Sequence, residues 1–176
     1  MEISSGGIFL RPWKISDAEE LALIADNKKI ADNLRDGFPN PYSIKNAVSW
    51  ISQVLSENQP TRFFAILIGN DLAGSIGIVT KSDIYRKNVE IGYFIAEKYW
   101  GRGTATSAIT AVTSYAFREF DIVRVYAEPF ADNSGSRRAL EKAGFIHEAT
   151  FCKNVFKNGL LKDSCIYSVL KENFRY

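Results

Sequence analysis

Three strand-like segments follow one another between residues 62 and 95, and this run constrains the fold more than any other feature of the chain. Residues 62–68, 72–80 and 89–95 are rich in β-branched and aromatic residues, which is typical of strands. The segments on either side show helical periodicity instead. A doubly wound fold needs strands and helices to alternate throughout, so the consecutive strands exclude it. We expect an α+β fold with an antiparallel meander near its centre.

The segments outside the meander complete the order strand, helices, meander, helix, strand, helix and hairpin. A short strand is expected at 8–11, helices at 105–116 and 133–143, and strands at 123–127, 145–156 and 160–170. The 176 residues are 46% hydrophobic and 24% charged, which is typical of an ordinary globular domain. A chain of this length buries enough surface to fold without a metal or a disulfide. We therefore expect one domain spanning residues 1–176.

Charge and rare residues exclude several classes of function. A net charge of +2 is too small for a general nucleic-acid or membrane-surface binder. The chain has one histidine, His147, and its two cysteines lack the CxxC spacing of a zinc site. No apolar run approaches the roughly 20 residues that cross a membrane. We expect a cytoplasmic protein with no metal site and no nucleic-acid or membrane partner.

A glycine-rich turn between the meander and the next helix is the strongest local signal for ligand binding. It contains Gly101, Arg102 and Gly103, followed by Thr104 and Ala105 at the start of the helix. Glycines permit a tight turn and a close approach to a ligand, and a helix N-terminus offers unpaired N–H groups to an anion. The turn lacks the lysine of a P-loop and the third glycine of a dinucleotide fingerprint. It predicts a site for a phosphate or pyrophosphate.

The surroundings of this turn resemble the acetyl-CoA motif of the GCN5-related N-acetyltransferase (GNAT) superfamily. The motif has the form Q/R-x-x-G-x-G/A after a strand, and Trp100 stands where Gln or Arg is usual. That departure is common in the branch that contains RimJ and RimL. Further matches to the branch run in the same order along almost the whole chain: Leu10-Arg11-Pro12, Asp17-Ala18-Glu19-Glu20-Leu21, Asn133 with Ser136, Gly144-Phe145, and Asn158-Gly159 with Asp163 and Tyr167.

The resemblance implies a mixed αβα sandwich with a GNAT-like fold. Its central sheet is mixed, mostly antiparallel, splayed in the middle and flanked by helices. The pantetheine arm of acetyl-CoA is then expected between the fourth strand, 89–95, and the fifth, 123–127, and the pyrophosphate on the glycine-rich turn. The residues implied in cofactor binding are Phe94, Ile95, Ala96, Gly101, Arg102, Gly103, Thr104, Ala105 and Asn133.

The resemblance implies two residues in catalysis, and each also has a non-catalytic interpretation. Glu90 corresponds to a carboxylate that faces the substrate amine, directly or through water; otherwise it is a charge on a solvated sheet face or a partner of Lys87. Ser136 corresponds to a serine proposed to protonate the departing CoA thiolate; otherwise it is a serine in the first turn of a helix. Other branches use a tyrosine where this chain has Leu140, which cannot donate a proton. The sequence leaves these alternatives open.

The resemblance predicts an acetyl-CoA-dependent N-acetyltransferase that acts on a primary amine. The acceptor is a protein or peptide N-terminus or a small-molecule amine, attacked directly in a ternary complex, and the enzyme is a monomer or a homodimer. Neither cysteine has the context of a nucleophile, which argues against an acetylated enzyme. A catalytically silent acyl-CoA sensor with the same fold and a nucleotide-binding protein are the alternatives. The segment from Phe38 to Tyr42 either walls an acceptor pocket or belongs to the core.

The two cysteines provide a test of strand register. If Asn158 and Gly159 form a two-residue hairpin turn, residues whose numbers sum to 317 lie opposite each other. Cys152 and Cys165 meet that condition. We expect them to face each other as free thiols, because a cytoplasmic protein rarely keeps a disulfide.

Overall fold

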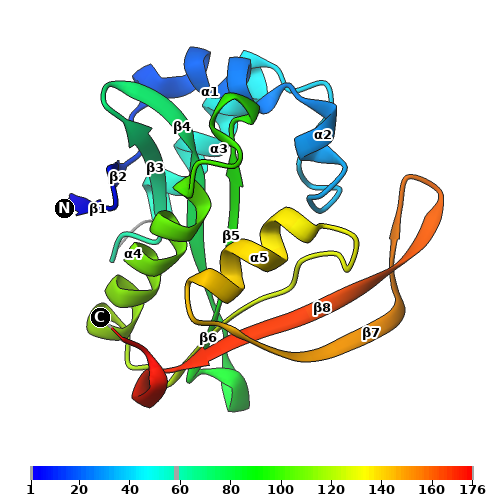
Figure 1. Ribbon diagram of the computed structural model, residues 1–176. Coiled ribbons are helices and arrows are strands. Elements are labelled where there is room, and N and C mark those ends of the chain that lie inside the picture. Colours follow the sequence, from blue (N-terminus) through cyan, green and yellow to red (C-terminus); the bar gives the residue numbers. More distant parts are fainter. Residues whose placement is uncertain (1, 58–59, 176) are drawn as a thin grey trace.

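A sheet of eight strands organises the part of the chain that the structure describes (Figure 1). The structure is a computed structural model, and it describes residues 2–57 and 60–175. The strands lie in the order β1-β2-β3-β4-β5-β6-β8-β7. In chain order the elements are β1 (Ile3–Ser5), β2 (Ile8–Pro12), α1 (Ala18–Ala25), α2 (Lys28–Ala31), α3 (Ile44–Glu57), β3 (Phe63–Ile68), β4 (Asp71–Thr80), β5 (Asn88–Ile95), α4 (Thr104–Glu119), β6 (Arg124–Ala127), α5 (Ser134–Lys142), β7 (Ile146–Lys157) and β8 (Leu160–Leu170). The predicted α+β class, with a mixed sheet flanked by helices, is confirmed.

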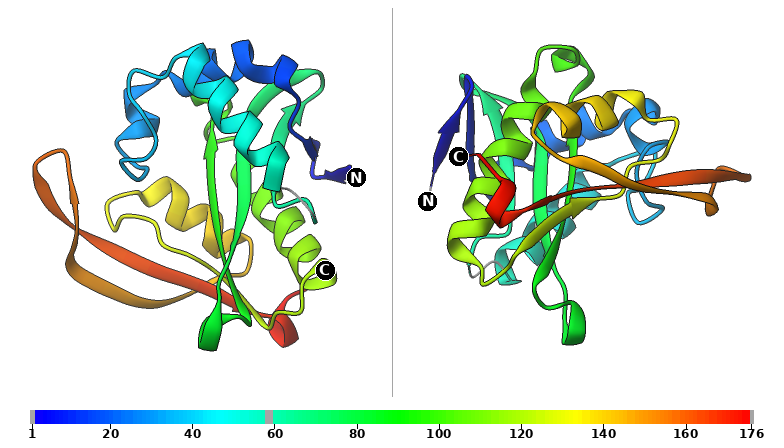
Figure 2. Two further views of the ribbon diagram at one scale, coloured as in Figure 1. Left: turned by 180° about the vertical axis from the view of Figure 1, so that it is seen from behind. Right: turned by 60° about the horizontal axis from the view of Figure 1, so that its bottom comes forward.

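The sheet divides where β5 meets β6. All other neighbouring strands are antiparallel, but β5 and β6 run parallel because α4 crosses over between them. Their pairing covers three positions, from Asn88 opposite Arg124 to Glu90 opposite Tyr126. Beyond Glu90 the strands separate, as Figures 1 and 2 show, and within the described residues 91–95 pair only with β4. This splayed gap lies where the resemblance to the GNAT superfamily implied it.

Helices cover both faces of the sheet, and each face has its own core. On one face, α4 and α5 pack on inward side chains that include Ile76, Val89 and Ile91. On the other face, α1 and α3 enclose a cluster around Trp13, Ala65 and Leu72 (Figure 2). Among the described residues, no helix is long and apolar enough to cross a membrane. The two faces matter for function because alternate residues of β5 point to opposite cores.

The N-terminal edge of the sheet contains one strand more than expected. The segment before 8–11 is itself a strand, β1, joined to β2 through Gly6 and Gly7 with φ of 54° and 80°. A Cβ on Gly6 would overlap the hydroxyl of Ser107 in α4. Glycine is therefore required here both for its positive φ and for its close approach to the helix.

The C-terminal hairpin confirms the predicted turn and contradicts the predicted cysteine pair. Asn158 and Gly159 join β7 to β8, and both have positive φ. The register begins as expected, with Lys157 opposite Leu160, but it shifts between Phe151 and Val155, so Cys165 lies opposite Thr150.

A bulge causes this shift. Cys152 and two residues after it are inserted into β7 opposite a shorter stretch of β8, and Lys153 has a φ of 51°. The carboxylate of Asp163 accepts a hydrogen bond from the Lys153 N–H at 2.7 Å and holds the bulge in place. Both cysteines are free thiols, Cys152 exposed and Cys165 buried.

An ion pair ties the end of β2 to the start of α1. The two terminal nitrogens of Arg11 each donate to an oxygen of Asp17 at 2.8 Å, and Asp17 also accepts from the Lys14 N–H. Burial alone would raise the pKa of Asp17, but the hydrogen bonds from Arg11 and Lys14 outweigh it and lower that pKa. The stabilisation is therefore present above the pKa of an unfolded aspartate, about 3.9, and is lost as the pH falls through the lower folded value.

We expect Asp17→Asn to lower the free energy of unfolding by about 2 kcal/mol at pH 7, because it removes charge-assisted hydrogen bonds that are largely shielded from water. Urea unfolding of both proteins between pH 3 and pH 7 measures the effect. The difference should shrink below about pH 4, because Asp17 of the unfolded chain begins to take up a proton there while the folded residue, with its lower pKa, stays ionised. A difference that stays constant over this range would contradict the assignment.

Candidate active site

The unpaired side of β5 forms one wall of the gap. The N–H of Ala96 donates to the carbonyl of Ala73 on β4 at 2.8 Å, and the carbonyl of Ala96 accepts from Tyr99. Because hydrogen-bonding direction alternates along a strand, the backbone groups of Phe94 also point to β4, whereas those of Tyr93 and Ile95 point into the gap. Of the three strand residues implied in cofactor binding, Ile95 is thus the one whose backbone faces the gap. Binding of the cofactor by Phe94 and Ala96 stays a prediction.

Trp100 occupies one of the backbone hydrogen-bonding groups on this wall. Its indole N–H donates to the carbonyl of Ile95 at 2.7 Å, at the end of the unpaired edge. The side chain that departs from the usual Gln or Arg therefore fixes the path of the chain from β5 into the glycine-rich turn. This leaves the N–H of Ile95 and the backbone of Tyr93 facing the gap.

The glycine-rich turn leads from this wall into α4. Gly101 and Gly103 have φ of 74° and 81°, in the left-handed region that disfavours other residues. A Cβ at either position would meet no described protein atom within 4 Å, so the requirement for glycine comes from the backbone conformation. The N–H of Ser107 donates to the carbonyl of Gly103, and the first turn of α4 before it has no partner within the helix. Arg102 is exposed and Thr104 is buried.

The N-terminus of α5 lies against the unpaired part of β5. Asn133 caps this helix, since its side-chain oxygen accepts from the N–H of Ser136 at 3.1 Å. The Ser136 hydroxyl lies 2.7 Å from the hydroxyl of Tyr93 on β5, and either oxygen can donate. Leu140 is buried in the core, in agreement with its exclusion as a proton donor. The structure therefore brings Ser136 to the gap and adds a tyrosine beside it.

Tyr93 was missed by the reading of the sequence, although a signal for it existed. Strand alternation places it on the opposite face of β5 from Glu90, toward α5. Burial raises the pKa of Tyr93 to about 12, although its hydrogen bond to Ser136 acts in the other direction. The phenol is therefore neutral at physiological pH and is available as a hydrogen-bond donor to Ser136.

Glu90 lies on the other face of β5, in a cluster of opposite charges. It is 8% exposed, so it does not lie on a solvated face. One oxygen accepts from Arg35, and the other accepts from Lys81 at 2.8 Å and Tyr126 at 3.4 Å. The pairing with Lys87 considered from the sequence does not occur, because Lys87 binds Asp121. Glu90 thus lies near the position where β5 and β6 separate, and each of its two carboxylate oxygens accepts a hydrogen bond from a cationic side chain.

Comparison with known proteins decides the family. A family model described as an acetyltransferase (GNAT) domain matches residues 8–146. The chain belongs to the GNAT acetyltransferase family. The enzyme class predicted from the resemblance is thereby confirmed, and the sensor alternative is not favoured.

GNAT proteins of known sequence or structure resemble the chain over nearly its full length. A Bacillus subtilis protein named probable N-acetyltransferase YjcK is 30% identical over 171 residues, 93% of each chain. The structure of RimL, a ribosomal-protein acetyltransferase in complex with coenzyme A, has a TM-score of 0.85 at 21% identity and covers 97% of this chain and 98% of its own. The microcin self-immunity acetyltransferase MccE, in complex with acetyl-CoA and AMP, has a TM-score of 0.80 at 26% identity, covering 93% and 92%. The likeness to RimL shows a shared fold.

Two further polar residues of this GNAT chain, Arg137 and His147, contact the C-terminal hairpin. Arg137 donates to the hydroxyl of Tyr167 at 3.1 Å and to the carbonyl of Ala131 at 2.9 Å, so it links α5 to β8. His147 is exposed, and its ring lies 3.0 Å from the hydroxyl of Thr150. Both contacts belong to the C-terminal hairpin and its junction with α5.

Proposed function

We propose that this protein transfers the acetyl group of acetyl-CoA to a primary amine. The observation that carries the proposal is the junction of three features at one gap: the free edge of β5, the N-terminus of α4 behind its glycine turn, and Ser136 at the start of α5. The first offers backbone hydrogen bonds to an extended amide chain, the second holds an anion, and the third supplies a hydroxyl.

The residues around the gap fit acetyl-CoA. The backbone of Tyr93 and Ile95 would bind the pantetheine amides, and the turn from Gly101 to Ala105 would bind the pyrophosphate. Asn133 uses its oxygen to cap α5, which leaves its amide nitrogen for the pantetheine. Acetyl-CoA supplies an activated thioester, whose carbonyl carbon is open to attack by an amine. Arg102, being exposed beside the turn, is placed to meet a phosphate.

The roles of the chain's own residues are to orient the amine, exclude water and supply a proton. The amine nitrogen forms a bond to the acetyl carbon as the carbon–sulfur bond breaks, and the nitrogen loses a proton to water. Ser136 would pass a proton to the departing sulfur and take up another from water. Cys152 lies in the bulge of β7, and Cys165 is buried on β8 beside Thr150. Neither lies on β5, α4 or α5, which border the gap, and this supports direct attack in a ternary complex.

The free amine is the reactive form, and this favours acceptors of low basicity. An α-amine with a pKa near 8 needs about 1 kcal/mol to lose its proton at pH 7, whereas a lysine near 10.4 needs about 4–5 kcal/mol. To take that proton itself, Glu90 would have to give up Arg35 or Lys81. We propose that Glu90 positions the amine side of the site by ordering these two cations and that the proton leaves through water.

We expect Glu90→Gln to lower kcat/KM about 10-fold without moving the acidic limb of the pH–rate profile, because the variant loses two charge-assisted contacts but the limb belongs to the amine. The pH–rate profiles of the wild type and of Glu90→Gln between pH 6 and pH 9 measure both kcat/KM and the position of the acidic limb. Asp121→Asn serves as the control, since it removes an exposed carboxylate paired with Lys87 and should change neither quantity. A limb that shifts in Glu90→Gln would show that Glu90 accepts the proton.

Binding and turnover are tested separately. Calorimetry with acetyl-CoA, CoA and ATP should show binding of the first two and none of ATP, which would exclude a nucleotide-binding protein. Thiol release from acetyl-CoA in the presence of a panel of primary amines then measures transfer. Binding of acetyl-CoA without thiol release from any amine would indicate a sensor and would overturn the proposal.

A further inference from the structure

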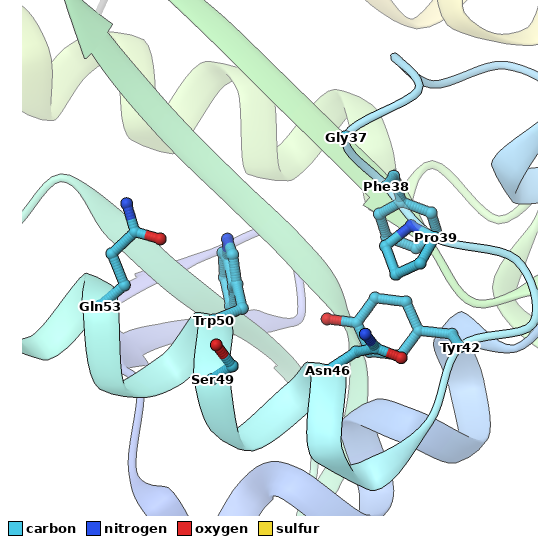
Figure 3. A pocket seen from close by; sticks show the side chains of 8 residues that line it. All are labelled: Gly37, Phe38, Pro39, Tyr42, Asn46, Ser49, Trp50 and Gln53. Carbon is cyan, nitrogen blue, oxygen red and sulfur yellow. The ribbon is translucent and has the colours of Figure 1, made fainter.

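A groove lies between α3 and the segment from Gly37 to Tyr42, on the same side of the sheet as Glu90. Its volume is about 510 Å³, and Figure 3 shows the eight side chains that line it. Four of them are aromatic or proline: Phe38, Pro39, Tyr42 and Trp50. None of these eight described residues carries a charged side chain. Burial raises the pKa of Tyr42, and its hydroxyl is neutral. The groove therefore suits an uncharged, flat group.

The aromatic walls of the groove extend to the unpaired part of β5. The ring of Phe38 packs on Phe94 with centroids 5.5 Å apart, and Trp50 packs edge-on against Phe63 at 6.2 Å. Phe94 projects from β5 on the same face as Glu90, two residues beyond Gly92. The groove thus ends beside the unpaired part of β5, where acetyl transfer is proposed to take place.

Gly92 marks an opening at this end of the groove. Phe63, Gly77 and Gly92 lie directly opposite one another on β3, β4 and β5. The ring of Phe63 covers Gly77, whereas a Cβ on Gly92 would meet no described atom within 4 Å, and Gly92 is exposed. An acceptor can therefore approach β5 between Glu90 and Phe94 with one end in the groove.

The carboxylates around this opening offer little to a polycation. Glu90 is held by Arg35 and Lys81. The two aspartates that follow α2 are paired as well, since Asp32 binds Lys28 and Asp36 binds Lys157. Asp26, beside the groove, accepts a hydrogen bond from the N–H of Tyr42. Because Glu90, Asp32 and Asp36 already have cations, a polyamine that binds these three would have to displace one for each charge that it brings.

We infer that the acceptor is a monoamine that carries an aromatic group, with its amine over Gly92 and its ring in the groove between Phe38 and Trp50. This inference rests on the proposed acetyl transfer and names the class of acceptor. A free aromatic amine and a peptide that begins with an aromatic residue share this chemistry. Burial of such a ring increases kcat/KM about 10- to 100-fold over a methyl group.

The test compares phenylalaninamide with alaninamide, and a tripeptide beginning with phenylalanine with one beginning with alanine, by thiol release from acetyl-CoA. Spermidine is the polycationic comparison. We expect each aromatic compound to exceed its alanine counterpart at least 10-fold in kcat/KM and to exceed spermidine. Whichever aromatic compound is faster, amide or tripeptide, identifies the source of the acceptor.

A pair of matched variants locates the ring. Ser49→Trp fills the groove from an exposed position on α3, whereas Ser52→Trp adds the same side chain to the same helix at an exposed position that does not line the groove. We expect Ser49→Trp to raise the KM for phenylalaninamide about 10-fold and to leave that for alaninamide unchanged. Ser52→Trp should change neither, and both variants should bind acetyl-CoA like the wild type.

The outcomes separate this inference from acetyl transfer itself. Equal rates with phenylalaninamide and alaninamide, or spermidine as the best acceptor, would overturn the inference and leave acetyl transfer standing. A preference for aromatic acceptors that survives Ser49→Trp would also overturn it, because the ring would then bind elsewhere. Thiol release from none of these amines would overturn both proposals.

Discussion

Gly103→Val is expected to weaken acetyl-CoA binding at least 100-fold, the largest effect among the changes considered. Gly103 caps α4 with a φ of 81°, a conformation that a β-branched residue adopts only under strain. Because a Cβ there would meet no described protein atom, the substitution does not disturb the core. It redirects the N–H groups at the start of α4 and places a side chain where the pyrophosphate is proposed to lie.

Calorimetry with acetyl-CoA measures this loss, and Gly69→Val is the matched control. Gly69 lies in the turn between β3 and β4 with a φ of 60° and has no described atom within 4 Å of its Cβ position. Both variants therefore carry similar backbone strain, and their melting temperatures should fall by similar amounts. If Gly69→Val weakened binding as strongly, general strain would explain the result; if Gly103→Val bound normally, the turn would not be the pyrophosphate site.

The order of elements could be predicted from the sequence because its signals are local. Period-two and helical patterns distinguish strands from helices within short windows, and Asn158-Gly159 specifies a hairpin turn by its own backbone preferences. The glycine turn followed from a short motif, whereas the splayed gap was implied only by the resemblance to the GNAT superfamily. The elements and the two turns depend on residues that are neighbours in the chain.

Contacts between distant segments could not be predicted in the same way. Cys152 and Cys165 satisfy the hairpin arithmetic, but the Asp163 carboxylate stabilises a bulge at Lys153, and the inserted residues shift the register of the part of β7 that precedes them. The partners of Glu90 come from three separate segments: the loop after α2, the loop after β4, and β6. A strand pattern indicates which face a residue occupies but not which charges reach it.

The pair of Tyr93 and Ser136 shows what the structure adds to the candidate site. The sequence singled out Ser136 alone, and the fold places it 2.7 Å from a tyrosine 43 residues earlier in the chain. Because the pKa of Tyr93 is raised to about 12 by burial, this phenol remains protonated at neutral pH. If it donates to the Ser136 oxygen, the serine proton is left to point toward the departing thiolate. Tyr93 is therefore proposed as a positioning residue for Ser136.

We expect Ser136→Ala to lower kcat about 10- to 100-fold with unchanged affinity for acetyl-CoA. A thiol with a pKa of about 8.5 is already a fair leaving group near pH 7, so a proton donor assists the reaction without being indispensable. The backbone N–H of residue 136 still donates to Asn133, so the cap of α5 is retained. Ser134→Ala, an exposed serine in the same first turn, is the control and should keep the wild-type rate.

The double variant decides whether the two hydroxyls act as one unit. Tyr93→Phe should lower kcat by a smaller factor, about 3- to 10-fold, because Ser136 remains but is no longer oriented. If Tyr93 acts only through Ser136, then Tyr93→Phe in the Ser136→Ala background should cost nothing further, since coupled residues give non-additive losses. Additive losses would show that Tyr93 acts independently of the serine. Full kcat in Ser136→Ala across the pH range would show that the serine only begins a helix, and transfer would then depend on positioning alone.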